Sequence, residues 1–208
     1  ILGEIKDQRY KIIDGDFIVY APKMFEEIIE LDGMSKQMSN SLDLKKNLRR
    51  IKEAGITDGG KSGEFFFFSM DNKLIIKTVT DSEFNILLRI LPQYTQHFRD
   101  NPNSLIAKIY GAFTFTREAP YEKYNLILMK NINGYTSKCV ERKYDLKGST
   151  VARNVLKGNE TYTLAELKTK GTLKDLDFNK YEERVWIDNL LKKEILEILR
   201  KDVSFLRA

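Results

Sequence analysis

A glycine-rich segment followed at once by phenylalanines constrains this chain more than any other feature. Residues 55–62 read Gly-Ile-Thr-Asp-Gly-Gly-Lys-Ser and fit the pattern GxxxxGK[ST] of phosphate-binding P-loops. A P-loop lies between a preceding strand and a following helix, because the helix N-terminus receives the phosphate. Here a helical pattern precedes the glycines over residues 39–54, and the strand-forming run Phe65–Phe68 follows them. The order of elements therefore argues against a P-loop ATPase, which we keep as an alternative.

The residues after the glycines fit a different phosphate-binding arrangement. Residues 64–69 and 73–79 predict two strands joined by a short turn, and a helix follows over residues 81–98. In protein kinases, a glycine-rich loop between antiparallel strands folds its backbone over a nucleoside triphosphate. The next strand carries a lysine for the phosphates, and the following helix carries a glutamate that holds this lysine. Lys77 and Glu83 match this order, and a plain β-hairpin with a glycine turn is the structural alternative.

The rest of the chain also alternates helices and strands. Apolar spacing predicts further helices over residues 22–33, 39–54 and 181–206. It predicts further strands over residues 10–13, 107–115 and 124–129. In the helix at 39–54 we expect one apolar side, formed by Leu42, Leu44, Leu48 and Ile51. The last helix has an apolar stripe that we expect to pack against another domain, formed by Ile187, Leu190, Leu191, Ile195, Ile198 and Leu199. Residues 135–145 are predicted to be extended, and residues 157–177 to be polar and irregular.

Composition excludes several classes of protein. The single cysteine, Cys139, rules out an internal disulfide bond and a cysteine-based zinc site, which favours a reducing compartment. His97 is the only histidine, and we expect it to be an exposed helix residue rather than a catalytic base. No apolar run approaches the ~20 residues that span a bilayer. The formal net charge of +5 favours anionic partners. Any contact with a membrane is therefore expected to be peripheral.

A basic segment stands out in the second half of the chain. Residues 138–157 contain six Lys or Arg and two Asp or Glu, which gives a local charge of +4. Within them, Lys147 and Arg153 flank a Gly-Ser-Thr turn, which could bind phosphate through charge and backbone amides. A solvated basic loop and an RNA-binding loop are the alternatives, although Tyr135 and Tyr144 are too sparse for a base-stacking platform.

Several motifs occur in the order in which one family carries them. They are DFIVYAPKMFEEI at 16–28, GKSGEFFFFSMDNKLIIKTV at 60–79, NPNSLIAKIYG at 101–111, YDLKGSTVAR at 144–153, KDLDF at 174–178 and LRKDVSFL at 199–206. Together they resemble the phosphatidylinositol phosphate kinases over roughly residues 16–206, and YDLKGST is the most specific of them.

On the nucleotide side, the resemblance implies a role for three groups of residues. Gly60, Ser62 and Gly63 would belong to the nucleotide loop. Lys77 matches the lysine that binds the ATP phosphates, and Glu83 matches its helix partner. The hinge, where backbone groups would contact the adenine, matches Met129, Lys130, Asn131 and Ile132.

On the lipid side, the resemblance implies that Lys147 and Arg153 grip the phosphates of the inositol headgroup, while Asp145 and Gly148 shape the same motif. The implied activity is transfer of the ATP γ-phosphate to a phosphatidylinositol monophosphate. The glycine loop is more like that of the 5-kinases, and YDLKGSTVAR is closer to the 4-kinases. We prefer a 5-kinase acting on phosphatidylinositol 4-phosphate.

The implied fold is α/β (α+β), a two-lobed protein-kinase-like core with an antiparallel sheet and flanking helices. Its expected parts are an N-terminal extension or edge strand at 1–15, a nucleotide-binding amino lobe at 16–131, and the hinge and beginning of the substrate lobe at 132–208. ATP and Mg²⁺ are the implied cofactors, and we expect no metal ligands within this chain. In the family the catalytic and metal-binding aspartates are expected after residue 208, so this chain alone is expected to bind nucleotide without turnover.

The implied partners are a phosphoinositide substrate and an anionic membrane surface on the cytoplasmic side, without nucleic acid, and a homodimer through the amino lobe is a further possibility. A non-catalytic phosphoinositide-binding scaffold with the same fold is the competing hypothesis. Lys77 and Glu83 argue against it, because a scaffold has no need of this pair.

Overall fold

The computed structural model describes residues 7–12, 14–54, 57–59, 64–134, 140–156, 161–182 and 186–208. The chain forms two compact units, Ile1–Gly134 with Ile195–Ala208, and Tyr135–Glu194. Residues 16–131 lie within the first unit, which also includes the end of the chain. No helix among the described residues is long and apolar enough to cross a membrane.

The first unit is built on a seven-stranded antiparallel sheet in the order β1-β2-β6-β7-β5-β4-β3. Its strands are β1 (Gln8–Ile12), β2 (Gly15–Tyr20), β3 (Thr57–Gly59), β4 (Glu64–Phe68), β5 (Leu74–Val79), β6 (Ile109–Glu118) and β7 (Tyr121–Lys130). The predicted mixed α/β fold with an antiparallel sheet is thus confirmed. Because β4 is a strand that pairs with β3 and β5, the helix that a P-loop requires after its glycines is absent. The P-loop alternative is therefore excluded.

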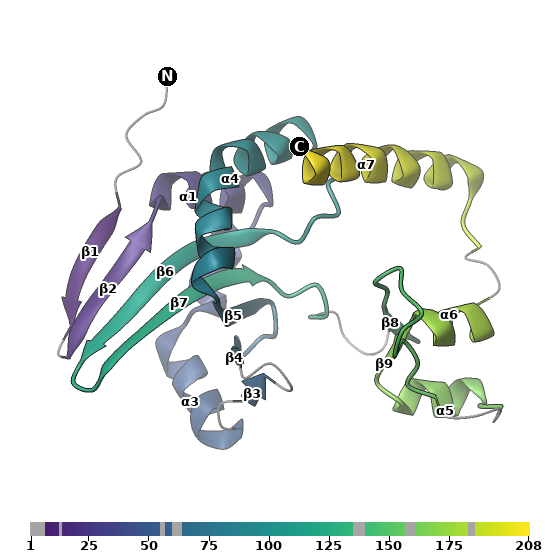
Figure 1. Ribbon diagram of the computed structural model, residues 1–208, viewed down its shortest axis with the longest axis horizontal. Coiled ribbons are helices and arrows are strands. Elements are labelled where there is room, and N and C mark those ends of the chain that lie inside the picture. The colour runs from purple at the N-terminus through teal and green to yellow at the C-terminus, as the bar shows by residue number, and fades with distance from the viewer. Residues whose placement is uncertain are drawn as a thin grey trace. The chain divides into compact units, whose positions relative to one another are not determined.

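Two helices, α1 (Pro22–Leu31) and α4 (Asp81–Asp100), cover one face of this sheet (Figure 1). Helix α1 begins with a proline, whose fixed φ suits the first helical position. Helix α4 begins with a capping box in which the Thr80 side chain and Glu83 satisfy each other's backbone N–H groups. The apolar faces of both helices bury Phe25, Ile28, Phe84, Leu87, Leu91 and Phe98 against residues of β6 and β7. These two helices and their core define the covered face of the sheet, the face on which the Lys77 side chain also lies.

The segment predicted as one helix at 39–54 is instead two helices, α2 (Ser35–Ser41) and α3 (Leu44–Ala54). The chain turns between them at Leu42 and Asp43, and the Asp43 carboxylate accepts a hydrogen bond from the backbone N–H of Lys46 at 2.8 Å. The leucines of the predicted apolar side of α3 are not buried. Leu44 and Leu48 are exposed, whereas the polar Asn47 is buried.

Helix α7 (Asn189–Arg207) is held on the first unit by a buried carboxylate near its end. Asp202 is 4% exposed and accepts hydrogen bonds from Ser104 Oγ at 2.7 Å, from the backbone N–H of Leu105 at 2.8 Å and from His97 Nε2 at 2.8 Å. The ring of Phe205 stacks on His97. The expectation that His97 is exposed was therefore wrong, because its partner is 105 residues away in the sequence.

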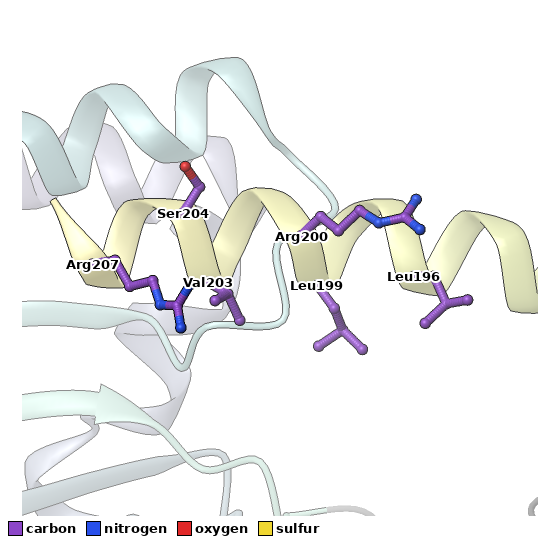
Figure 2. A pocket seen from close by; sticks show the side chains of 6 residues that line it. All are labelled: Leu196, Leu199, Arg200, Val203, Ser204 and Arg207. Carbon is purple, nitrogen blue, oxygen red and sulfur yellow. The ribbon is translucent and has the colours of Figure 1, made fainter.

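The apolar stripe of α7 is only partly buried. Figure 2 shows Leu196, Leu199 and Val203 on one side of the helix, while Ser204 points to the opposite side. Leu190, Leu191 and Leu199 are exposed, and Ile195 and Ile198 are half-buried. The helix also begins at Asn189, later than predicted, since residues 186–188 are not helical.

The second unit contains a two-stranded parallel sheet and two short helices. The elements are β8 (Lys143–Asp145), α5 (Leu164–Thr169), β9 (Thr172–Lys174) and α6 (Asp175–Tyr181). Its small core consists of Leu156, Leu167 and Leu173. The prediction of an irregular segment over residues 157–177 was wrong for its second part, because α5, β9 and the start of α6 lie there. Thr163 and Glu166 form a capping box that begins α5.

Candidate functional site

The strand β5 places Lys77 on the helix-covered face of the sheet. Lys77 pairs with Ile127 of β7, and Ile127 pairs with Ala112 of β6. Directly paired residues of antiparallel strands have their side chains on the same face. Ile127 and Ala112 are both buried in the core beneath α1 and α4. The side chain of Lys77 is therefore on the α4 side of the sheet.

Glu83, the predicted partner of Lys77, lies in the first turn of α4. Its carboxylate accepts hydrogen bonds from the backbone N–H of Thr80 at 2.9 Å and from the Thr80 hydroxyl at 2.8 Å. These hydrogen bonds, together with the nearby positive charge of Lys77, lower the pKa of Glu83. Among the described residues, none of the ion pairs joins Lys77 to Glu83. The two residues are thus near each other, with Glu83 acting as a helix cap.

The predicted hinge comprises the last two residues of β7, Met129 and Lys130, and the two residues after it, and neighbouring segments hold part of it in place. The Lys130 ammonium lies 2.8 Å from Asp32 Oδ2, and the backbone N–H of Lys130 donates a hydrogen bond to the Lys108 carbonyl at 2.9 Å. The backbone N–H of Asn131 donates to Lys73 O at 2.8 Å. Ile132, by contrast, is 62% exposed. Of the four hinge residues, Ile132 is thus the most open to a ligand. The predicted loop residues Gly60, Ser62 and Gly63 lie outside the described residues.

The predicted headgroup motif is organised by one carboxylate, Asp175, at the start of α6. Asp175 Oδ1 accepts hydrogen bonds from the backbone N–H groups of Lys147 at 2.9 Å and Gly148 at 2.8 Å. Its Oδ2 accepts a hydrogen bond from Arg153 Nε at 2.7 Å. Asp175 itself is buried. The carboxylate therefore fixes both ends of the turn that carries Lys147.

These contacts also determine the charge state of Asp175. Burial on its own would raise the pKa of Asp175, but the hydrogen bonds from Arg153 and from the amides of Gly148 and Lys147 outweigh it and lower the pKa to about 2. The carboxylate is thus ionised at neutral pH. The turn also needs a glycine, because Gly148 has φ +66, a left-handed conformation that L side chains rarely adopt.

The two predicted headgroup residues differ in their surroundings. The Lys147 side chain is 65% exposed, and its ammonium lies 3.7 Å from Asp145 Oδ2. Arg153 is buried, and besides Asp175 its guanidinium contacts the carboxylate and the backbone carbonyl of Asp145. Lys147 is therefore placed to reach a ligand, whereas Arg153 is surrounded by the acceptors that shape the turn.

Sequence reasoning assigned no role to the acidic pair in KDLDF. Asp177 accepts hydrogen bonds from the backbone N–H groups of Val155 at 2.9 Å and Leu156 at 3.2 Å, where the motif around Arg153 ends. Asp175 and Asp177 together connect α6 to the segment 147–156. The signal that could have identified them is two acids, separated by one residue, at the start of a helix after a strand.

A family model described as phosphatidylinositol-4-phosphate 5-kinase matches residues 47–208. The chain is 35% identical over 202 residues to phosphatidylinositol 4-phosphate 5-kinase 8 of Arabidopsis thaliana, covering 96% of this chain and 24% of that protein. It is 33% identical over 191 residues to phosphatidylinositol 5-phosphate 4-kinase type-2 alpha of Sus scrofa, covering 91% of this chain and 44% of that protein. It is also 32% identical over 212 residues to phosphatidylinositol 4-phosphate 5-kinase of Plasmodium falciparum, covering 96% of this chain and 12% of that protein.

The chain therefore spans less than half the length of these relatives, which include both 5-kinases and a 4-kinase. The family match includes the segments that carry Lys77, the hinge, Lys147 and Asp175. Because that match extends over most of the chain, the chain belongs to the phosphatidylinositol phosphate kinase family.

Proposed function

We propose that the protein to which this chain belongs is a lipid kinase. It transfers the γ-phosphate of ATP to the inositol ring of a phosphatidylinositol monophosphate, and its preferred substrate is phosphatidylinositol 4-phosphate. The observation that carries the proposal is the turn fixed by Asp175, which presents the Lys147 ammonium to solvent. A rigid turn with an exposed cation suits an anionic headgroup, because little conformational entropy is lost on binding.

On the lipid side, each residue of the turn has a separate task in this proposal. Lys147 binds a phosphate of the headgroup directly. Arg153, which already holds Asp175 and Asp145, positions the turn and adds positive charge behind it. Gly148 allows the backbone to turn where another residue would be strained.

On the nucleotide side, Lys77 neutralises the α- and β-phosphates of ATP, and backbone groups near Ile132 contact the adenine. Phosphoryl transfer depends mainly on positioning and charge neutralisation, so a lysine on an inner strand of the sheet suits it. Glu83 keeps the start of α4 in place beside Lys77. Mg²⁺ would supply further charge neutralisation in this chemistry. Among the described residues, no group of three His, Cys, Asp or Glu side chains is arranged to hold a metal, so we derive no step through the ion from them.

The headgroup assignment is tested by steady-state kinetics on vesicles, with the chain extended along its natural reading frame. Lys147→Ala is expected to raise the KM for the lipid at least tenfold, because a charge-assisted phosphate contact contributes roughly 1.5–3 kcal/mol. The KM for ATP should not change. Lys168→Ala, which removes another exposed lysine of the same unit, is the matched control. An unchanged lipid KM in Lys147→Ala would contradict the assignment.

The competing function is a phosphoinositide-binding scaffold without catalysis. The position of Lys77 on the inner strand β5, on the α4 side of the sheet, favours the kinase. If the protein were a scaffold, the wild type and the Lys77→Met variant would bind phosphoinositide vesicles equally well, and neither would transfer phosphate.

A further inference from the structure

Helix α3 is attached to the first unit by its polar side. The Asn47 amide donates hydrogen bonds to the backbone carbonyls of Ser41 and Asp43, both at 2.8 Å. Its Oδ1 accepts a hydrogen bond from the backbone N–H of Met70 at 2.9 Å. Arg50, one turn further, donates to the Ser69 carbonyl at 2.8 Å. Asn47 and Arg50 therefore attach α3 to the fold through hydrogen bonds.

The leucines of α3 lie on the side of the helix next to these anchoring groups, where Ile51 is half-buried. Leu44 is 70% exposed and Leu48 is 45% exposed, and they lie one turn apart on the same face. Leu42, in the turn that leads into α3, is 40% exposed. An amphipathic helix normally turns its apolar side to the core. Here Leu44 and Leu48 remain exposed instead, and clustered exposed apolar side chains indicate an interaction surface.

Basic side chains accompany these leucines. Lys45, Lys46 and Arg49 are all exposed, and they follow or adjoin the leucines along the helix. Asp43, the acid that directly precedes α3, is half-buried and accepts a hydrogen bond from the backbone N–H of Lys46. The outward side of α3 thus combines leucines with an excess of positive charge.

We propose that α3 is a membrane-contacting helix, with Leu42, Leu44 and Leu48 inserted at the surface of a bilayer that contains anionic lipids. Leucines flanked by lysines and arginines are the composition of helices that lie in the plane of the interface. The positive charges select an anionic surface, because each basic residue near such a surface strengthens binding. An apolar protein partner would not require these cations. The inference is independent of the proposed kinase function, since it concerns attachment to the bilayer and not the headgroup turn.

The test is co-sedimentation of the chain with vesicles of phosphatidylcholine alone or mixed with phosphatidylserine. The chain should bind only the mixed vesicles. The double variant Leu44→Ser/Leu48→Ser should weaken binding roughly tenfold or more, because two partly buried leucines lose their apolar contact. Lys45→Glu/Lys46→Glu should weaken it roughly 25-fold or more, since each basic residue contributes about fivefold.

Two controls match these changes. Ile86→Ser alters an apolar side chain of α4 that is also 45% exposed, and Lys192→Glu/Lys193→Glu reverses two exposed charges on α7. Neither should alter binding. Equal binding by wild type and both α3 variants, or no binding by wild type, would overturn the proposal. Loss of binding in the charge variant alone would also overturn it, because the leucines would then not insert. Finally, the wild type could form a dimer without lipid, and only the leucine variant could be a monomer. That result would identify the surface as a protein interface instead.

Discussion

Replacing Asp202 by alanine removes the acceptor that holds the end of α7 on the first unit. The side chain is 4% exposed and accepts three hydrogen bonds, from Ser104 Oγ, Leu105 N–H and His97 Nε2. Without it, the buried donors of Ser104 and His97 and the partly buried N–H of Leu105 lose their partner, and each unsatisfied buried donor costs about 1–3 kcal/mol. Domain stability is only about 5–15 kcal/mol, so the loss is a large fraction of the total. We expect Asp202→Ala to lower the unfolding free energy of the first unit by ~3–5 kcal/mol.

The assay must report on the first unit alone, because a chain with two units need not unfold in one step. Urea titration followed by the amide resonances of α4 meets this need. Asp202→Asn, which keeps one acceptor oxygen, should cost less than Asp202→Ala. Glu197→Ala removes a largely exposed acid from the same helix and should change stability by less than about 0.5 kcal/mol. If Asp202→Ala were as mild as Glu197→Ala, the buried network would not be what holds α7.

Three further predictions concern the headgroup turn and the nucleotide side. Because Asp175 has its pKa lowered to about 2, the stabilisation it provides is fully present above its usual pKa near 3.8 and is lost as the pH falls toward 2. The amide resonance of Gly148 should therefore titrate with a midpoint near 2, and a midpoint near 3.8 would show that the hydrogen bond does not form. Gly148→Ala should destabilise the second unit by about 1 kcal/mol through its positive φ alone, since nothing lies within 4 Å of the added Cβ. Urea titration of the β8 and β9 amide resonances measures this cost, and no change would mean that the turn adopts another conformation. In the extended protein, Lys77→Met should abolish phosphate transfer and leave the circular dichroism spectrum unchanged, whereas retained transfer would remove Lys77 from the proposed mechanism.

The parts of the fold that depend on local patterns could be predicted from the sequence. The hairpin of β4 and β5 follows from phenylalanine and β-branched residues around a turn, and α4 follows from its apolar spacing and its cap at Thr80. Lys77 could be assigned to its strand for the same reason.

The errors arose where distant partners decide the environment of a residue. His97 is buried because Asp202 and Phe205 return to it from the end of the chain. Helix α3 leaves Leu44 and Leu48 exposed because Asn47 and Arg50 hold it through hydrogen bonds to backbone groups of other segments. The apolar periodicity of the sequence does not reveal such hydrogen bonds. Asp175 was missed because its task is to accept backbone amides from a turn 27 and 28 residues earlier.

The measurement that tests the central claim most directly is labelled-phosphate transfer from Mg-ATP to vesicles that carry either phosphatidylinositol 4-phosphate or phosphatidylinositol 5-phosphate. The chain is compared with a form extended along its natural reading frame, and Lys147→Ala is included in the extended form. We predict that the extended form phosphorylates the 4-phosphate lipid preferentially and that Lys147→Ala impairs this transfer. Failure of the folded, vesicle-bound extended form to phosphorylate either lipid would contradict the proposed kinase and favour the scaffold.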